Sequence, residues 1–129
     1  LTEAGVPEGA HYFADGSGMS TYNRVTPRAT VTLLRWVAGQ PWGAEWRESL
    51  PIGGEDGTLG RRFKGTALEG AINAKTGSIN ASRALSGYMP GASGQMLVLS
   101  VFANDIPPGG EAAAVAAMDA ALLAIAAAN

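Results

Sequence analysis

The C-terminal tract EAAAVAAMDAALLAIAAAN is the longest apolar stretch in the sequence, and it constrains how the rest of the chain can fold. Its larger side chains recur at spacings of three, four and three residues, at Val115, Met118, Leu122 and Ile125. This spacing puts them on one stripe of a helix. A spanning helix needs about 20 apolar residues without a central charge, and Asp119 interrupts the tract. We therefore predict no transmembrane segment here, but an amphipathic helix that must cover a sheet.

Three segments upstream of the tract supply strands for such a sheet. Strand-forming residues run over about 71–78, 82–89 and 95–104, and the turn PGASG joins the last two. Consecutive strands with short connections are typical of an antiparallel meander. The sequence therefore predicts an α/β fold in which an antiparallel sheet is covered by the C-terminal helix.

Helix signals precede the strands. Thr26 is a good N-cap, Pro27 suits the first helical position, and ATVTLLRWVAG ends at Gly39. A second helix is expected over about 41–50, where Pro51 stops it.

Two stretches are irregular. Residues 1–25 are rich in Gly, Ser, Asp and Asn and predict loops and turns, with a short strand at about 11–14. The stretch LPIGGEDGTLGRRFKG, residues 50–65, holds five glycines and the turn signal Asp56-Gly57. It is expected to be an excursion rather than part of the core.

Composition excludes several classes of function. The chain has 129 residues, 47% of them hydrophobic, which suits one domain. Nine basic and eleven acidic side chains give a net charge of −2, so no basic stripe is available for nucleic acid. With no cysteine and one histidine, no metal site of the usual ligand types is expected, and no cofactor is predicted.

Candidate chemistry lies in the stretch NAKTGSIN, residues 73–80. A lysine in a strand is usually a solvated surface residue. Lys75, however, is followed by Thr76, Gly77 and Ser78, which supply two hydroxyls and a glycine that lets a ligand approach the backbone. This combination suits a small carboxylate, and Lys-Thr-Gly is one of the signatures of penicillin-binding proteins and serine β-lactamases.

Further segments agree with this signature in order and spacing. They are DGSGMSTYNRVTP at 15–27, SLPIGGEDGTLGRRFKG at 49–65 and AKTGSINASRALSGYM at 74–89. Over about 11–105 the chain resembles the C-terminal part of D-alanyl-D-alanine carboxypeptidases of the penicillin-binding protein 4 type, or low-molecular-mass class C.

The resemblance implies a penicillin-recognising fold and a bacterial cell-wall enzyme, periplasmic or otherwise extracytoplasmic. Such an enzyme removes the terminal D-alanine from peptidoglycan stem peptides, cuts peptide cross-links through an acyl-enzyme, and is acylated by β-lactams. A related β-lactamase or D-peptide esterase, and a non-catalytic peptidoglycan-binding fragment, remain alternatives.

The chain departs from the family at the nucleophile, because no serine has a lysine three positions later. Ser78-Ile79-Asn80 spells the Ser-x-Asn signature, but it directly follows Lys-Thr-Gly, whereas the family carries that motif far upstream. We read this match as accidental. In the family both missing motifs lie N-terminal to the segment seen here. Residues 1–129 are therefore expected to be the C-terminal part of the penicillin-binding domain, with the nucleophile outside them.

The resemblance also assigns roles at the signature. Lys75 would stabilise the substrate carboxylate and assist proton movement at the upstream serine, and Thr76 would donate a hydrogen bond to the same carboxylate. Gly77 would leave the strand edge open. The N–H of Ser78 would form half of the oxyanion hole.

Three more residues are predicted to contact substrate. Ser17 and Met19 match a segment that borders the family's pocket for the stem-peptide side chain, and Asn80 follows the signature. The family often has an arginine two positions after the residue matching Met19. Here that position is Thr21, which puts recognition of a charged diaminopimelate end in doubt.

Overall fold

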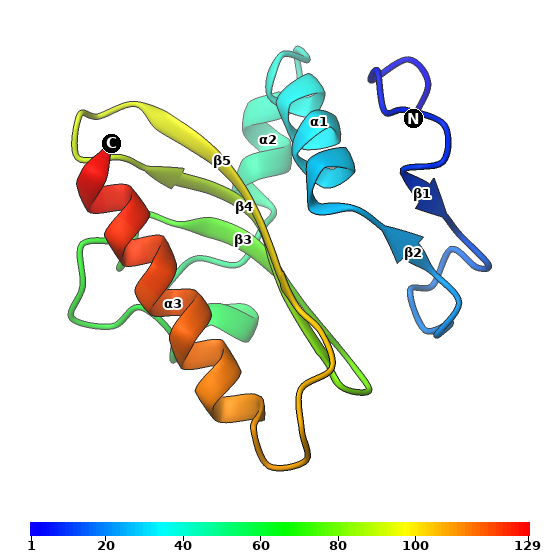
Figure 1. Ribbon diagram of the computed structural model, residues 1–129. Coiled ribbons are helices and arrows are strands. Elements are labelled where there is room, and N and C mark those ends of the chain that lie inside the picture. Colours follow the sequence, from blue (N-terminus) through cyan, green and yellow to red (C-terminus); the bar gives the residue numbers. More distant parts are fainter.

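The computed structural model describes residues 1–129. In chain order its elements are β1 (His11–Tyr12), β2 (Arg24–Val25), α1 (Pro27–Ala38), α2 (Gly43–Glu48), the 3-10 turn η1 (Gly57–Leu59), β3 (Asn73–Ile79), β4 (Ser82–Pro90), β5 (Met96–Ala103) and α3 (Glu111–Ala128). Strands β3, β4 and β5 form an antiparallel sheet in that order, and β1 pairs with β2 in a separate hairpin. The predicted meander and terminal helix are therefore confirmed (Figure 1).

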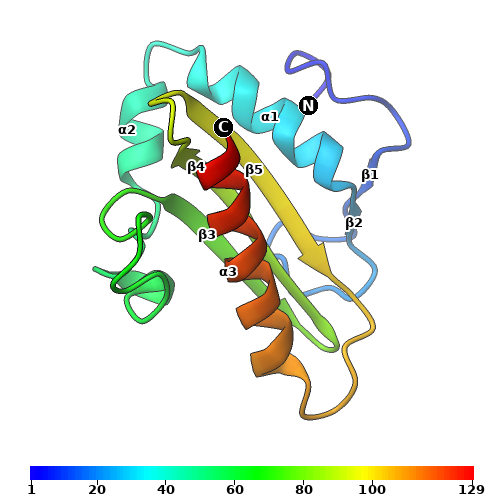
Figure 2. The same cartoon turned by 60° about the vertical axis from the view of Figure 1, so that its left-hand side comes forward.

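The three-stranded sheet has two differently covered faces. Figures 1 and 2 show α3 against one face, and α1 with the β1–β2 hairpin on the other side. Along β4, Leu85 and Met89 belong to the core cluster that includes α3, whereas the Tyr88 hydroxyl reaches α1. Because successive strand residues point to opposite faces, these residues fix the direction of every side chain in the sheet.

The main core lies between the sheet and α3. Helix α3 contributes Met118, Leu122 and Ala126 to the buried cluster. The predicted stripe was wrong at its last position, because Ile125 is 47% exposed and its neighbour Ala126 is buried instead. A helix advances 3.6 residues per turn, so four residues after Leu122 continue the buried line better than three.

The glycine-rich stretch does belong to the core, contrary to the sequence prediction. Its Leu59 and Phe63 are buried in the same cluster as α3, together with Leu68 and Ile72 just beyond it. The glycines form turns between these apolar residues, so single buried side chains occur without helical or strand periodicity. The stretch therefore shares its buried residues with both the sheet and α3.

One ion pair ties this stretch to α3. Arg62 Nε donates to both carboxylate oxygens of Asp119, at 3.2 and 3.1 Å, and Arg62 Nη2 also contacts Asp119 Oδ1. Their side chains are only 15% and 19% exposed. This bidentate pair explains how a carboxylate is accommodated in the middle of an apolar helix.

Helix α1 is held on the opposite face. Its N-cap is Thr26, whose Oγ1 accepts a hydrogen bond from the Ala29 N–H at 3.1 Å, as the sequence predicted. The buried Tyr88 hydroxyl donates to the Leu34 carbonyl at 2.8 Å, and burial raises the pKa of Tyr88. This contact links the middle of β4 to α1.

Two elements differ from expectation. Helix α2 is shorter at both ends than the predicted 41–50. The first strand is only His11–Tyr12, and its partner Arg24–Val25 was not predicted. Helix α3 is long and apolar enough to cross a membrane by length and composition, with a mean hydropathy of 1.7, and the predicted lack of a transmembrane segment stays a prediction. Core helices of soluble proteins pass the same test.

Candidate functional site

Strand β3 has an outer edge that is open along the Lys-Thr-Gly signature. At the start of the strand this edge is covered, because Ile52 forms a bridge with Asn73 and the Ala74 N–H donates to the Pro51 carbonyl at 3.0 Å. From Lys75 onward no strand lies beside it. The open edge therefore begins at the signature.

The backbone alternation determines which groups this edge presents. Since the N–H of Ala74 points outward, those of Thr76 and Ser78 point outward as well. Lys75 and Gly77 direct their backbone groups toward β4, where they pair with Ser86 and Ala84. The edge thus offers two unpaired N–H groups in the pattern that an added strand would use.

Lys75 lies on the sheet face that carries α1. Its strand partner Ser86 is hydrogen-bonded to Ser100 on β5, with 2.9 Å between the hydroxyl oxygens. The exposed Lys75 ammonium donates to the Thr76 carbonyl at 2.8 Å, and no carboxylate of the chain pairs with it. A row of polar side chains therefore crosses this face and ends in a cation at the open edge.

The other residues of the signature differ in their surroundings. Thr76 Oγ1 donates to Thr58 Oγ1 of η1 at 2.8 Å. Ser78 is exposed, and no hydrogen bond involves its side chain. A Cβ at Gly77 would meet only the Ala84 methyl, at 3.2 Å, so the space beyond this glycine is not filled by the chain.

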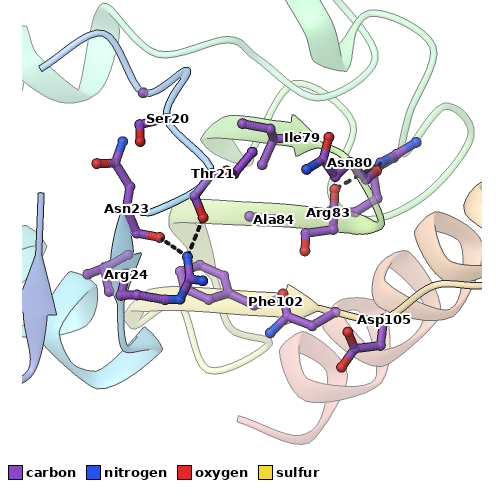
Figure 3. A pocket seen from close by; sticks show the side chains of 14 residues that line it. Ser20, Thr21, Asn23, Arg24, Ile79, Asn80, Arg83, Ala84, Phe102 and Asp105 are labelled. Atoms are coloured by element: carbon purple, nitrogen blue, oxygen red, sulfur yellow. Dashed lines mark hydrogen bonds between the residues drawn. The ribbon is translucent and has the colours of Figure 1, made fainter. Parts of the chain in front are cut away.

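A hollow of about 490 Å³ lies beside the end of β3, on the same face as Lys75. Its floor includes Ile79, Ala84 and Phe102, and its rim includes the loop before β2 (Figure 3). Figure 3 shows Arg24 reaching in from the hairpin, whereas the guanidinium of Arg83, on β4, lies beside Asn80 at the β3–β4 turn. The hollow therefore joins the hairpin to the strand that carries the signature.

The charges of this hollow are dominated by its two arginines. In each guanidinium, Nη1 donates to two backbone carbonyl oxygens, those of Thr21 and Asn23 for Arg24, and those of Asn80 and Ser82 for Arg83. The Nε and Nη2 groups have no partner. Asp105 is the single acidic residue in the lining, so the hollow carries one net positive charge.

The loop that forms the rim is organised by Asp15. Its carboxylate accepts hydrogen bonds from Asn23 Nδ2 at 2.9 Å, Ser17 Oγ at 3.0 Å and the N–H groups of Gly18 and Ser20 at 3.0 and 2.9 Å. These bonds, that of Asn23 foremost, hold the pKa of Asp15 below its ordinary value, against a smaller opposing effect of desolvation. The loop geometry therefore depends on an ionised carboxylate.

The structure brings together only part of the predicted site. Asn80 lines the hollow with Gly18, Ser20 and Thr21, whereas Ser17 and Met19 do not, and Met19 is 75% exposed. Asn80 has a φ of 45° in the two-residue turn between β3 and β4, a conformation that asparagine tolerates. Its contact with substrate stays a prediction.

Sequence reasoning missed Thr58, Arg24 and Arg83. Thr58 contacts the signature across 18 residues of chain, and no local pattern announces that contact. Arg24 and Arg83 lie in the matching segments, but only the fold places both in the lining of one hollow.

Comparisons with known proteins agree with these features. The D-Ala-D-Ala carboxypeptidase 3 (S13) family matches residues 1–127. The chain is 43% identical over 101 residues to a D-alanyl-D-alanine carboxypeptidase of Actinomadura sp. (strain R39), covering 74% of this chain and 19% of that protein. It is 32% identical over 111 residues to the D-alanyl-D-alanine carboxypeptidase DacB of Haemophilus influenzae, covering 84% and 23%.

Solved structures give the same result. The crystal structure of penicillin binding protein 4 from Haemophilus influenzae superposes with a TM-score of 0.74 at 32% identity, covering 80% of this chain and 23% of that one. A structure of that protein complexed with a novel β-lactam matches with a TM-score of 0.73, covering 80% and 24%. The chain thus spans about a fifth to a quarter of the length of the relatives it matches.

These matches confirm the predicted resemblance and the predicted fold class. The family match extends over nearly the whole chain, and both relatives exceed 30% identity. The chain therefore belongs to the D-Ala-D-Ala carboxypeptidase 3 (S13) family.

Proposed function

We propose that the protein containing this chain is a serine-type D-alanyl-D-alanine carboxypeptidase and endopeptidase of bacterial peptidoglycan, acting outside the cytoplasm. The observation that carries the proposal is the position of the open β3 edge, which starts at Lys75 and presents the Lys-Thr-Gly signature to solvent. An extended peptide ending in D-Ala-D-Ala, or a β-lactam that mimics it, would lie along this edge as an added strand.

Each residue of the signature has a role in this proposal. The Lys75 ammonium, which has no carboxylate partner, stabilises the terminal carboxylate of the substrate and assists proton transfer at the nucleophile. Thr76 donates a hydrogen bond to the same carboxylate. The outward N–H of Ser78 stabilises the oxyanion that forms when the carbonyl is attacked. Gly77 provides room for the peptide to approach.

The hollow beside Ile79 and Asn80 is proposed to take the side chain of the stem peptide. The family's arginine after Met19 is replaced by Thr21, but Arg24 lines the hollow, and its Nε and Nη2 groups make no hydrogen bond within the chain. Guanidinium groups bind carboxylates through paired N–H donors. A side chain that ends in a carboxylate therefore suits the hollow.

The nucleophile is proposed to lie outside residues 1–129, in the remainder of the same protein. The chain has no Ser-x-x-Lys, and it spans only 16–26% of the curated relatives that it matches. The outer edge of β5 is unpaired and is bordered by an apolar hollow of about 430 Å³ that includes Val31, Leu97 and Ile125. Apolar strand edges are usually covered in stable proteins, so we propose that the remainder packs here.

Adduct mapping with labelled penicillin tests this assignment. The complete protein is incubated with the label, digested, and analysed by peptide mass spectrometry. We expect the adduct on a serine outside residues 1–129. An adduct on Ser17, Ser20 or Ser78 would contradict the proposed division of the site, and a protein that is not labelled at all would favour a non-catalytic peptidoglycan-binding role.

A further inference from the structure

Thr58 lies in the turn η1, next to the signature, and none of the proposed chemical steps uses it. Its Oγ1 is 2.8 Å from Thr76 Oγ1, and this is the single side-chain hydrogen bond that Thr76 makes. Thr58 is itself exposed, so the contact does not serve the core. We propose that Thr58 is a positioning residue that holds the Thr76 hydroxyl for the substrate carboxylate, an inference that rests on the proposed function.

The turn that carries Thr58 is firmly attached to the fold. Leu59, the next residue, is fully buried in the core cluster. The Gly54 N–H donates to the Leu59 carbonyl at 3.0 Å, and the Ile52 N–H donates to Asp56 Oδ1 at 2.7 Å. These bonds on both sides of Thr58 give its hydroxyl a fixed position relative to β3, as a positioning group requires.

The hydroxyl pair can also reverse its direction. In the structure Thr76 is the donor and Thr58 the acceptor. A substrate carboxylate accepts hydrogen bonds only, so Thr76 must turn its proton toward it, and Thr58 can then donate to Thr76 Oγ1. A hydroxyl has one donor and two acceptor positions, which allows both arrangements. Donation from Thr58 polarises the Thr76 hydroxyl and strengthens its bond to the carboxylate.

The exposed surroundings favour a role in binding over one in stability. Neither hydroxyl is a buried group that would be left unpaired by loss of the other, because Thr58 is exposed and Thr76 half-buried. Removing the Thr58 hydroxyl should therefore leave the fold intact. It should release Thr76 to other rotamers and weaken recognition of a carboxylate only.

The experiment compares Thr58→Val and Thr58→Ser with the parent in the complete protein. Valine keeps the shape of the side chain and removes the hydroxyl, whereas serine retains it. The substrates are a peptide ending in D-Ala-D-Ala and the same peptide with its terminal carboxylate converted to an amide. Thr32→Val is the control, because the Thr32 hydroxyl bonds only to the Arg28 carbonyl of its own helix.

We expect Thr58→Val to lower kcat/KM for the free acid on the order of tenfold, the effect of one hydrogen bond to a charged group. The amide should change by less than about twofold, and Thr58→Ser should restore the parent value. An equal loss with both substrates, or no loss with either, would overturn the positioning role while the parent remains active. A parent that hydrolyses neither substrate and does not react with penicillin would overturn the proposed function itself, and this inference with it.

Discussion

The two faces of the three-stranded sheet carry different kinds of side chain. On the face toward α3, Ala74, Leu85 and Leu99 form an apolar row that is buried in the core. On the face toward α1, Lys75 and the hydrogen-bonded hydroxyls of Ser86 and Ser100 form a polar row that ends at the open edge. The same strands thus carry the apolar core on one face and the Lys75 cation on the other, whereas Thr76, whose strand partner Leu85 faces α3, reaches the open edge from the core side.

Two glycines on neighbouring strands give the sharpest test of this difference. Gly87 faces the core, and a Cβ there would lie 2.1 Å from the Asn73 carbonyl oxygen and 2.6 Å from Ala74 Cα. We predict that Gly87→Ala destabilises the complete protein by about 3 kcal/mol or more, because β3 and β4 must separate to admit the methyl group. Thermal unfolding measures this effect.

The matched variant is Gly77→Ala on the opposite face. Its methyl would meet only the Ala84 Cβ, at 3.2 Å, so the stability should change by less than about 1 kcal/mol. Acylation by penicillin should fall strongly, because the methyl occupies the approach to the edge. Equal free energies of unfolding for Gly87→Ala and Gly77→Ala would contradict the difference in packing between the two faces.

A second prediction concerns the support of the apolar face by the pair of Arg62 and Asp119. Replacing Asp119 with alanine leaves a largely buried guanidinium unpaired, and we expect a loss of about 3 kcal/mol. Denaturant unfolding of the complete protein measures it. Glu111→Ala, at the start of the same helix and without a salt bridge, is the control and should cost less than about 1 kcal/mol.

The smallest expected effect is the pH dependence of the loop at the rim of the hollow, through the ionisation of Asp15. The pKa of Asp15 is lower in the folded loop than its ordinary 3.8, so ionised Asp15 stabilises the loop above pH 3.8. This contribution is lost as the pH falls through the lower folded pKa. The amide resonances of Gly18 and Ser20 should report the transition by NMR, and Asn23→Ala should move its midpoint upward. A midpoint at or above 3.8 in the parent would contradict the hydrogen-bond network.

Elements with local signals could be predicted from the sequence. The cap at Thr26 and the stop at Gly39 fixed α1, and short turns separated the three strands. The glycine-rich stretch was misassigned because its composition indicates turns, while burial of Leu59 and Phe63 depends on where α3 passes. The chain folds its turns around isolated apolar residues, and such contacts leave no periodic pattern.

The candidate site likewise has one part that could be predicted from the sequence and one part that depends on the fold. Lys-Thr-Gly is a contiguous motif and was found directly, although its catalytic role stays a prediction. The hydrogen bond from Thr76 to Thr58 joins distant parts of the chain, and so does the hollow that both Arg24 and Arg83 line. They depend on the register of β3 with β4 and on the placement of the hairpin, which no local signal in the sequence fixes.

We propose that Lys75 at the open edge binds the substrate carboxylate and assists the acylation step. The decisive measurement is the second-order rate of penicillin acylation of the complete protein, for Lys75→Ala and Lys64→Ala against the parent. Lys64 is the only other lysine, is exposed, and lies in the glycine-rich stretch away from the signature. We predict that Lys75→Ala is slower by about 10² to 10³, the cost of losing one preorganised electrostatic partner, and that Lys64→Ala reacts at the parent rate. Equal acylation rates for all three proteins would contradict the proposed role of Lys75.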